Sequence, residues 1–244
     1  MEVHPHTHSE RKKFTHYLWE FLMLFLAVFC GFLAENIREW SVERHREKQF
    51  IQSFIEDLKT DTASIRQILN FREQKMERMD SLMLLLSVQQ IKGHEKELYF
   101  LGRTLVRSFW FRSNDRTITQ LKNSGSLRLI RNEQAADSMI SYQQLVEAIN
   151  TNQEDDRNER TATGPLLSRM FSPFVFDKMV TASGVNRLNY NPPLRSYDTT
   201  IQQDLAYYVH QLKGSNFIIE TRLELLNEKA KNIIAFFKKE YRLK

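Results

Sequence analysis

Three histidines near the N-terminus, His4, His6 and His8, have the most metal-like spacing in the chain. Alternate histidines in an extended segment lie on one side of the chain and can share a divalent ion. In a chain terminus this spacing usually produces only a weak, adventitious site. We therefore expect no resident metal and no other cofactor.

A second candidate site is segment 121–132, LKNSGSLRLIRN, which carries three cationic side chains: Lys122, Arg128 and Arg131. These side chains could contact a partner or a ligand. The segment is also typical of a helix that stops and restarts, because Gly125 can end one helix and Asn132 can cap the next. Both interpretations stay open at the level of the sequence.

Neither candidate is accompanied by a catalytic motif. The sequence contains no glycine-rich phosphate loop, and it lacks the motifs of serine hydrolases, zinc metalloproteases, thiol redox proteins and kinases. Cys30 is the only cysteine, which excludes a disulfide framework and a cysteine-based zinc site. We therefore expect a protein that is not an enzyme and has no catalytic residues.

Composition limits both the fold and the partners. Among 244 residues there are only 7 glycines and 5 prolines, too few for the turns of an all-β fold. The net charge is +5, but both signs are interspersed along the chain. A nucleic-acid-binding surface usually needs a basic stripe with interleaved aromatic residues, so we expect no nucleic-acid partner.

The elements that carry these residues begin with a membrane segment. Residues 21–34 have no charge, and extending this run to 14–34 produces a helix about 31 Å long, enough to cross a bilayer. Removal as a signal peptide is not expected, because Phe32 stands where the cleavage site needs a small residue. We therefore predict an uncleaved transmembrane helix over 14–34, preceded by a short basic tail over 1–13.

Aromatic residues mark the two ends of this segment. Trp19 lies on the N-terminal side and Trp40 just beyond the other end, as in the aromatic belts of membrane proteins. Glu20 lies within the predicted span, one helical turn after His16. The two could pair at the interface, or Glu20 could serve a partner helix or a proton. In either case we expect membrane lipid to contact this segment.

Residues 35–90 are predicted to continue the helix out of the bilayer. They contain neither glycine nor proline, and apolar residues recur at the 4-3 spacing of a coiled coil. The seam positions are Ile51, Ile55, Leu58, Thr62, Ile65, Leu69, Arg72, Met76, Met79, Met83 and Leu86. Only Thr62 and Arg72 interrupt the apolar pattern. We expect this seam to drive self-association or packing within the chain.

Beyond Gly93 the sequence predicts shorter helices and loops over 91–197. The charge-rich stretch 150–160 is expected to be a solvated helix end rather than a cation site. A second long helix is expected over 198–244. The prediction is an all-α fold, in which the transmembrane helix leads into an elongated antiparallel helical bundle.

The last helix has an apolar seam that needs a partner, and the first long helix is the only expected partner of comparable length. Antiparallel pairing would return the C-terminus to the bilayer, with Phe237 near residues 40–46 rather than near Gly93. Phe237 would then contact lipid, while neighbouring lysines would face anionic headgroups. Alternatively, the aromatic side chains at this end complete the core.

Several segments resemble an uncharacterised family of bacterial single-pass membrane proteins. The shared features are Glu20 near the start of the span, Trp40 just past it, Glu56-Asp57-Leu58 with Asp61, and segment 121–132. The resemblance implies an inner-membrane protein with its helical domain in the periplasm, and it implies no activity. Charge does not decide this orientation, because three basic residues precede the span and four follow it closely.

Three classes of function fit these features. The first is a membrane-anchored interaction or scaffold protein, whose helical domain binds another protein or a second copy of itself. The alternative is a ligand-sensing helical ectodomain, although only about 13 residues precede the span, too few for a cytoplasmic output domain. An enzyme is the least favoured class, because no motif supports it.

Overall fold

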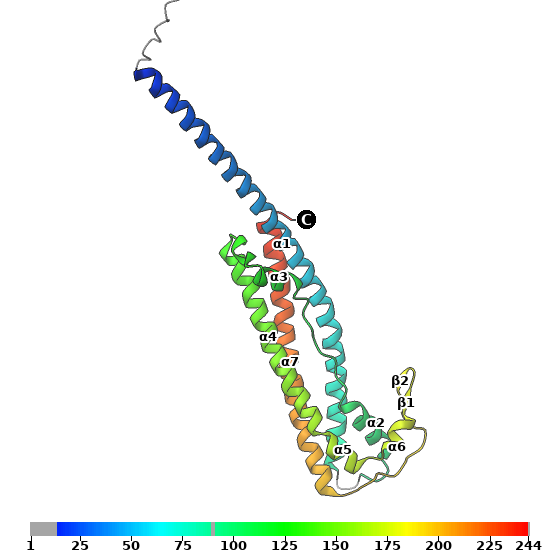
Figure 1. Cartoon of the computed structure of the whole chain (residues 1–244). Helices are drawn as coiled ribbons and strands as arrows, with labels where there is room; N and C mark the ends of the chain where they lie inside the picture. Colours follow the sequence, from blue (N-terminus) through cyan, green and yellow to red (C-terminus); the bar gives the residue numbers. More distant parts are fainter. Residues whose placement is uncertain (1–13, 89–90, 244) are drawn as a thin grey trace, which may run out of the picture. The chain divides into compact units, whose positions relative to one another are not determined.

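The computed structural model describes residues 14–88 and 91–243, which fold into helices joined by turns and loops (Figure 1). In chain order these are α1 (Phe14–Ser87), α2 (Glu95–Leu105), α3 (Arg116–Asn123), the 3₁₀ helix η1 (Ser126–Leu129), α4 (Glu133–Ala162), α5 (Gly164–Met170), α6 (Pro173–Lys178) and α7 (Thr199–Glu240). Before α7, the two-residue strands β1 (Val180–Thr181) and β2 (Gly184–Val185) form an antiparallel hairpin. The predicted all-α class is confirmed.

The chain divides into two compact units, Met1–Gln49 and Phe50–Lys244. The first contains the N-terminal part of α1, in which residues 14–42 are exposed. Within the described residues, α1 is the one helix long and apolar enough to cross a membrane. The second unit contains the rest of the chain and has its own core.

Three long helices form a bundle in the second unit: α1 from residue 50 onward, α4 and α7 (Figure 1). Three contacts show that α7 runs antiparallel to α1: Phe54 with Phe237, Arg72 with Asn216, and Leu86 with Gln202. It also runs antiparallel to α4, because Ser215 contacts Glu159 and Arg222 contacts Ala148. The predicted antiparallel bundle is confirmed.

The helix expected after Asn132 is α4, which has 30 residues and packs along α7. The end of this helix differs from the prediction in one respect. The stretch 150–160 is not simply solvated, because it buries Gln153, Asp156 and Arg160. The prediction failed because charged residues are rarely buried, and apolar spacing cannot reveal a buried face that is polar.

The predicted seam of α1 lies inside the bundle. Its buried members are Ile51, Ile55, Leu58, Ile65, Arg72, Met79 and Leu86. The buried face is wider than the seam, because α1 has neighbours on two sides and also buries Phe54, Ile68 and Leu82. The seam therefore packs within the chain.

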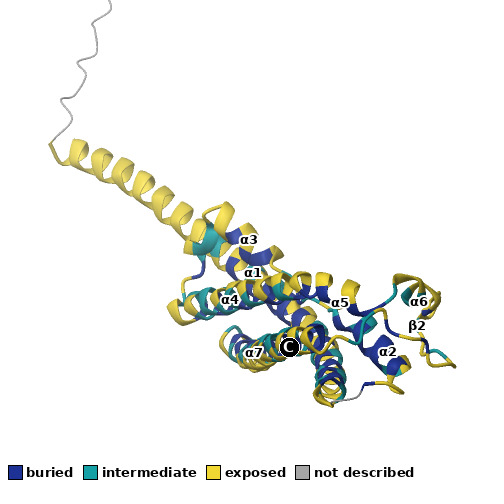
Figure 2. Cartoon of the chain, turned by 90° about the horizontal axis from the view of Figure 1, so that it is seen from below, coloured by how far each residue is buried: buried dark blue, intermediate teal, exposed yellow. Residues whose placement is uncertain are grey.

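Two apolar cores lie along this bundle. The first combines residues 51–68 of α1 with α3, α4 and residues 219–237 of α7. The second combines residues 79–86 of α1 with α2, α5 and residues 201–212 of α7. Figure 2 shows the buried residues on the inner sides of the helices. Between the two cores, α1, α4 and α7 place polar residues in the interior, which we call the polar layer: Arg72, Lys75, Asp156, Arg160 and Asn216.

Glycine marks two special positions in the second core region. Helix α1 ends at Ser87, before the predicted boundary at residue 90, and Gly93 follows with a φ of +96° that favours glycine. In α2, a Cβ on Gly102 would lie 2.9 Å from the ring of Phe171. The absence of a side chain at Gly102 therefore lets Phe171 pack closely against α2.

Candidate functional site

The predicted membrane contacts lie on the N-terminal part of α1. Trp19 and Trp40 are 63% and 48% exposed, respectively. The Glu20 carboxylate lies 3.0 Å from a ring nitrogen of His16, as expected for residues one turn apart. The Arg44 guanidinium lies over the Trp40 ring, 4.8 Å from its centre. These positions suit a lipid-facing segment, and contact with lipid stays a prediction.

Segment 121–132 is a helix stop and restart. Gly125 takes a φ of +64° after α3, and the Asn132 side chain caps α4 by accepting a 3.0 Å hydrogen bond from the Ala135 amide. The three cationic side chains on this segment are all exposed: Lys122, Arg128 and Arg131. The structural interpretation is confirmed, while a partner-binding role for these cations stays a prediction.

Phe237 is not a lipid contact, because it is fully buried. Its ring lies 6.1 Å from that of Phe54 and 6.2 Å from that of Tyr241. Phe237 lies on the apolar seam of α7, and this seam packs against α1. Phe237 therefore completes the core. Its contact with Phe54 agrees with the expected antiparallel pairing of α7 and α1, although the contact falls at Phe54 and not within the expected range 40–46.

The three N-terminal histidines lie outside the described residues. Over 14–88 and 91–243, no group of three or more histidine, cysteine, aspartate or glutamate side chains is placed to hold a metal ion.

Two buried carboxylates on α1, Asp57 and Asp61, anchor the start of α3. Asp57 accepts a 2.9 Å hydrogen bond from the Thr117 amide, in the first turn of α3, where a helix favours negative charge. Asp61 accepts three hydrogen bonds: from the Ser113 hydroxyl at 2.6 Å, the Asn114 amide at 2.7 Å and the Tyr142 hydroxyl at 2.7 Å. These contacts join α1, α3 and α4.

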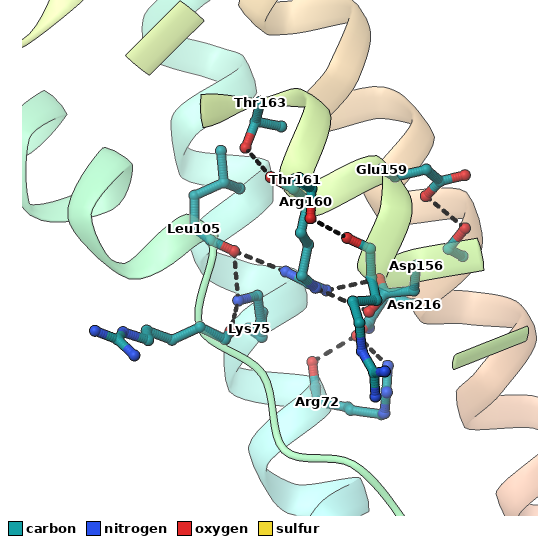
Figure 3. A network of polar contacts seen from close by, with 12 residues as sticks. Arg72, Lys75, Leu105, Asp156, Glu159, Arg160, Thr161, Thr163 and Asn216 are labelled. Atoms are coloured by element: carbon teal, nitrogen blue, oxygen red, sulfur yellow. Dashed lines mark hydrogen bonds and ion pairs between the residues drawn. The ribbon is translucent and has the colours of Figure 1, made fainter. Parts of the chain in front are cut away.

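The polar layer contains a buried ion pair (Figure 3). Asp156 and Arg160, one turn apart on α4, form two hydrogen bonds of 2.7 and 2.8 Å. Arg160 Nη1 also donates to the Leu105 carbonyl at the end of α2, at 2.7 Å. From α1, Arg72 Nη1 donates to the side-chain oxygen of Asn216 at 2.9 Å. The polar layer therefore ties α1, α2, α4 and α7 together.

Arg72 is the least satisfied member of the polar layer. Its Nε and Nη2 atoms have no hydrogen-bond partner among the described residues. Burial lowers the pKa of Arg72 to about 10, so the guanidinium remains charged at neutral pH. The nearby Asp156 carboxylate opposes this shift, because it stabilises the charged form.

Lys75 connects the polar layer to the end of α2. Its ammonium donates to the backbone carbonyls of Thr104 at 3.1 Å, Leu105 at 2.6 Å, and Arg107. The last carbonyls of a helix have no partner within it, so Lys75 completes this helix end. Burial, and then the positive charge of Arg160, lowers the pKa of Lys75 to about 6. The three carbonyls act in the opposite direction, because they bind the ammonium form.

A cavity of about 400 Å³ lies beside Lys75. Helix α1 lines it with Phe71, Lys75 and Arg78, among others. Helix α2 lines it with Phe100, Leu101, Thr104 and Leu105. Arg107 and Phe109, which follow α2, and Gly184 and Val185 of the hairpin complete the lining. By tying down the end of α2 and the backbone of Arg107, Lys75 shapes one wall of this cavity.

The outer face of α7 exposes apolar side chains. Tyr207, Ile218 and Leu225 fall on one side of the helix, are 58%, 45% and 58% exposed, and form what we call the α7 stripe. Leu225 also lines a groove of about 610 Å³ between α7 and α4, together with Phe236 and Ser138. Single exposed apolar residues are ordinary, whereas a row of them beside a groove is typical of a surface that binds a helix.

No protein-family model, no curated protein and no solved structure matches this chain. The resemblance to bacterial single-pass membrane proteins therefore stays a prediction. The features of the structure that bear on function are the apolar N-terminal part of α1, the cavity and the outer face of α7.

Proposed function

We propose that this protein is a membrane-anchored interaction protein that acts by binding and not by catalysis. Residues 14–34 of α1 form a single-pass anchor in the inner membrane, and the helical domain lies in the periplasm. The length and apolar character of this part of α1 support the anchor. The resemblance to bacterial single-pass proteins supports the orientation.

The observation that supports an interaction role is the α7 stripe beside the groove between α7 and α4. Leu225 and Phe236 supply apolar surface on the α7 side of the groove. On the α4 side, Ser138 and Ser141 are small, so another backbone can approach closely. The partner that fits is an amphipathic helix of another protein, which would bury its apolar face against the α7 stripe.

Site-specific photocrosslinking tests this proposal. We expect a photoreactive amino acid in place of Leu225, in the full chain in its native membrane, to form one discrete protein adduct. The matched control is the exposed neighbouring residue Glu224, which points about 100° away around the helix and should form no adduct. Ser141→Trp, which fills the groove, should abolish the Leu225 adduct.

Equal yields of adduct from Leu225 and Glu224 would exclude the groove as the binding surface. An adduct from Leu225 that persists in Ser141→Trp would exclude it as well. An adduct of twice the mass of the chain would identify the partner as a second copy and not as a different protein.

The orientation of the anchor has a separate test. We expect Lys92→Cys, in a Cys30→Ser background, to react with a membrane-impermeant maleimide in intact spheroplasts, because Lys92 is exposed in the helical domain. Cys30 is replaced because it is the only other cysteine. Labelling that occurs only after the membrane is broken would place the domain in the cytoplasm.

A further inference from the structure

The cavity beside Lys75 combines an apolar wall with positive charge. Its wall includes Phe71, Leu82 and Leu101. Its basic lining residues are Lys75, Arg78 and Arg107, of which the two arginines carry the positive charge, and no aspartate or glutamate of the described chain lines it. A volume of about 400 Å³ lies within the range of small-molecule sites.

The protein does not neutralise the two arginines of this lining. Arg78 lies over the Phe100 ring, 5.7 Å from its centre, and neither Arg78 nor Arg107 forms an ion pair with a carboxylate of residues 14–88 or 91–243. Arg187 also lies over Phe100, at 3.8 Å, but Glu97 holds it through two hydrogen bonds. Arg78 and Arg107 therefore remain available to an anion.

We propose that this cavity binds a small organic anion, a molecule with one carboxylate or similar acid group on an apolar body. The acid group contacts Arg107 and Arg78, and the body lies against the aliphatic and aromatic wall. An anion is favoured over a neutral molecule because it relieves the repulsion among neighbouring cations. Arg107 and Phe109 are exposed while Leu82 is fully buried, so the ligand enters from the side of Arg107.

Octanoate is a suitable probe for this site. Its binding is measured by isothermal titration calorimetry on the full chain in phosphatidylcholine nanodiscs, with empty nanodiscs as the reference. We expect octanoate to bind at least about tenfold more tightly than 1-octanol and octylammonium, which have the same chain but no negative charge. This expectation does not depend on the proposed protein partner.

Two variants locate the bound anion. Arg107→Gln removes a charge-assisted contact at an exposed position and should weaken octanoate binding at least about tenfold. The matched control is Arg112→Gln, which removes the same charge from an exposed arginine outside the cavity and should leave binding unchanged. Val185→Trp, on the surface hairpin, should fill the cavity and abolish binding.

Equal affinity for the three probes would overturn the proposal, and so would octanoate binding that survives both Arg107→Gln and Val185→Trp. Nanodiscs that contain phosphatidylglycerol separate two sources of the anion. Octanoate binding that is unchanged in them supports a free organic acid, whereas binding that weakens in them and recovers at higher octanoate concentration would identify a lipid phosphate group that competes for the same cavity.

Discussion

Replacing Asp156 with asparagine is expected to destabilise the helical domain by about 3–5 kcal/mol. Asp156 is fully buried and forms both hydrogen bonds of the ion pair with Arg160. Its loss leaves Arg160 and Arg72 in the interior without the carboxylate that compensates their charge. Urea denaturation of the full chain in detergent, followed by circular dichroism, measures the change in the free energy of unfolding.

Asp155 provides the matched control, because it is the adjacent residue and is exposed. Asp155→Asn removes the same charge and should change the free energy of unfolding by less than about 0.5 kcal/mol. Combining Asp156→Asn with Arg160→Met should recover part of the loss, because an unpaired buried charge is worse than none. Equal effects of the two single replacements would show that the ion pair does not stabilise the fold.

Asp61→Ala is the second replacement with a large expected effect, about 3–5 kcal/mol of lost stability. The carboxylate accepts hydrogen bonds from three groups that would lose their partner: the Ser113 hydroxyl, the Asn114 amide and the Tyr142 hydroxyl. Burial and the nearby Asp61 raise the pKa of Tyr142, so this hydroxyl keeps its proton and needs an acceptor. The same denaturation experiment measures the effect.

Glu56→Ala is the control for this second prediction. Glu56 lies one turn before Thr60 on the exposed side of α1 and pairs with Lys59 at 2.7 Å, also on the surface. Its removal should change stability by less than about 1 kcal/mol, because exposed ion pairs contribute little. If Asp61→Ala has an effect as small as that, the anchoring of α3 by this carboxylate is not important for stability.

The apolar spacing of the chain predicts the first and last helices well. Both α1 and α7 keep an apolar face over many turns, and both end within a few residues of the predicted boundaries. The sequence also predicts the helix that Asn132 caps, but it indicates a solvated end over 150–160, where α4 instead buries Gln153, Asp156 and Arg160. Methods based on apolar periodicity cannot detect such a face.

One feature of the sequence indicates the polar layer. Arg72 interrupts the seam of α1, and a basic residue at a core position must find an acceptor in the interior. The acceptor is Asn216, which is 144 positions away along the chain. No feature of the sequence marks Asn216 as that partner, or Lys75 as the residue that completes α2.

The sequence by itself determined the apolar N-terminal segment, the long helices at both ends and the stop and restart at 121–132. Helix propagation, capping and the length of an apolar run depend on residues within a few turns of one another, so local composition is enough to specify them. Only the tertiary structure decided that α4 covers α7, that Phe237 faces Phe54 and that Arg78 and Arg107 share one cavity. These features depend on which distant residues meet when the helices pack, and side chains of the same type are buried or exposed according to that packing.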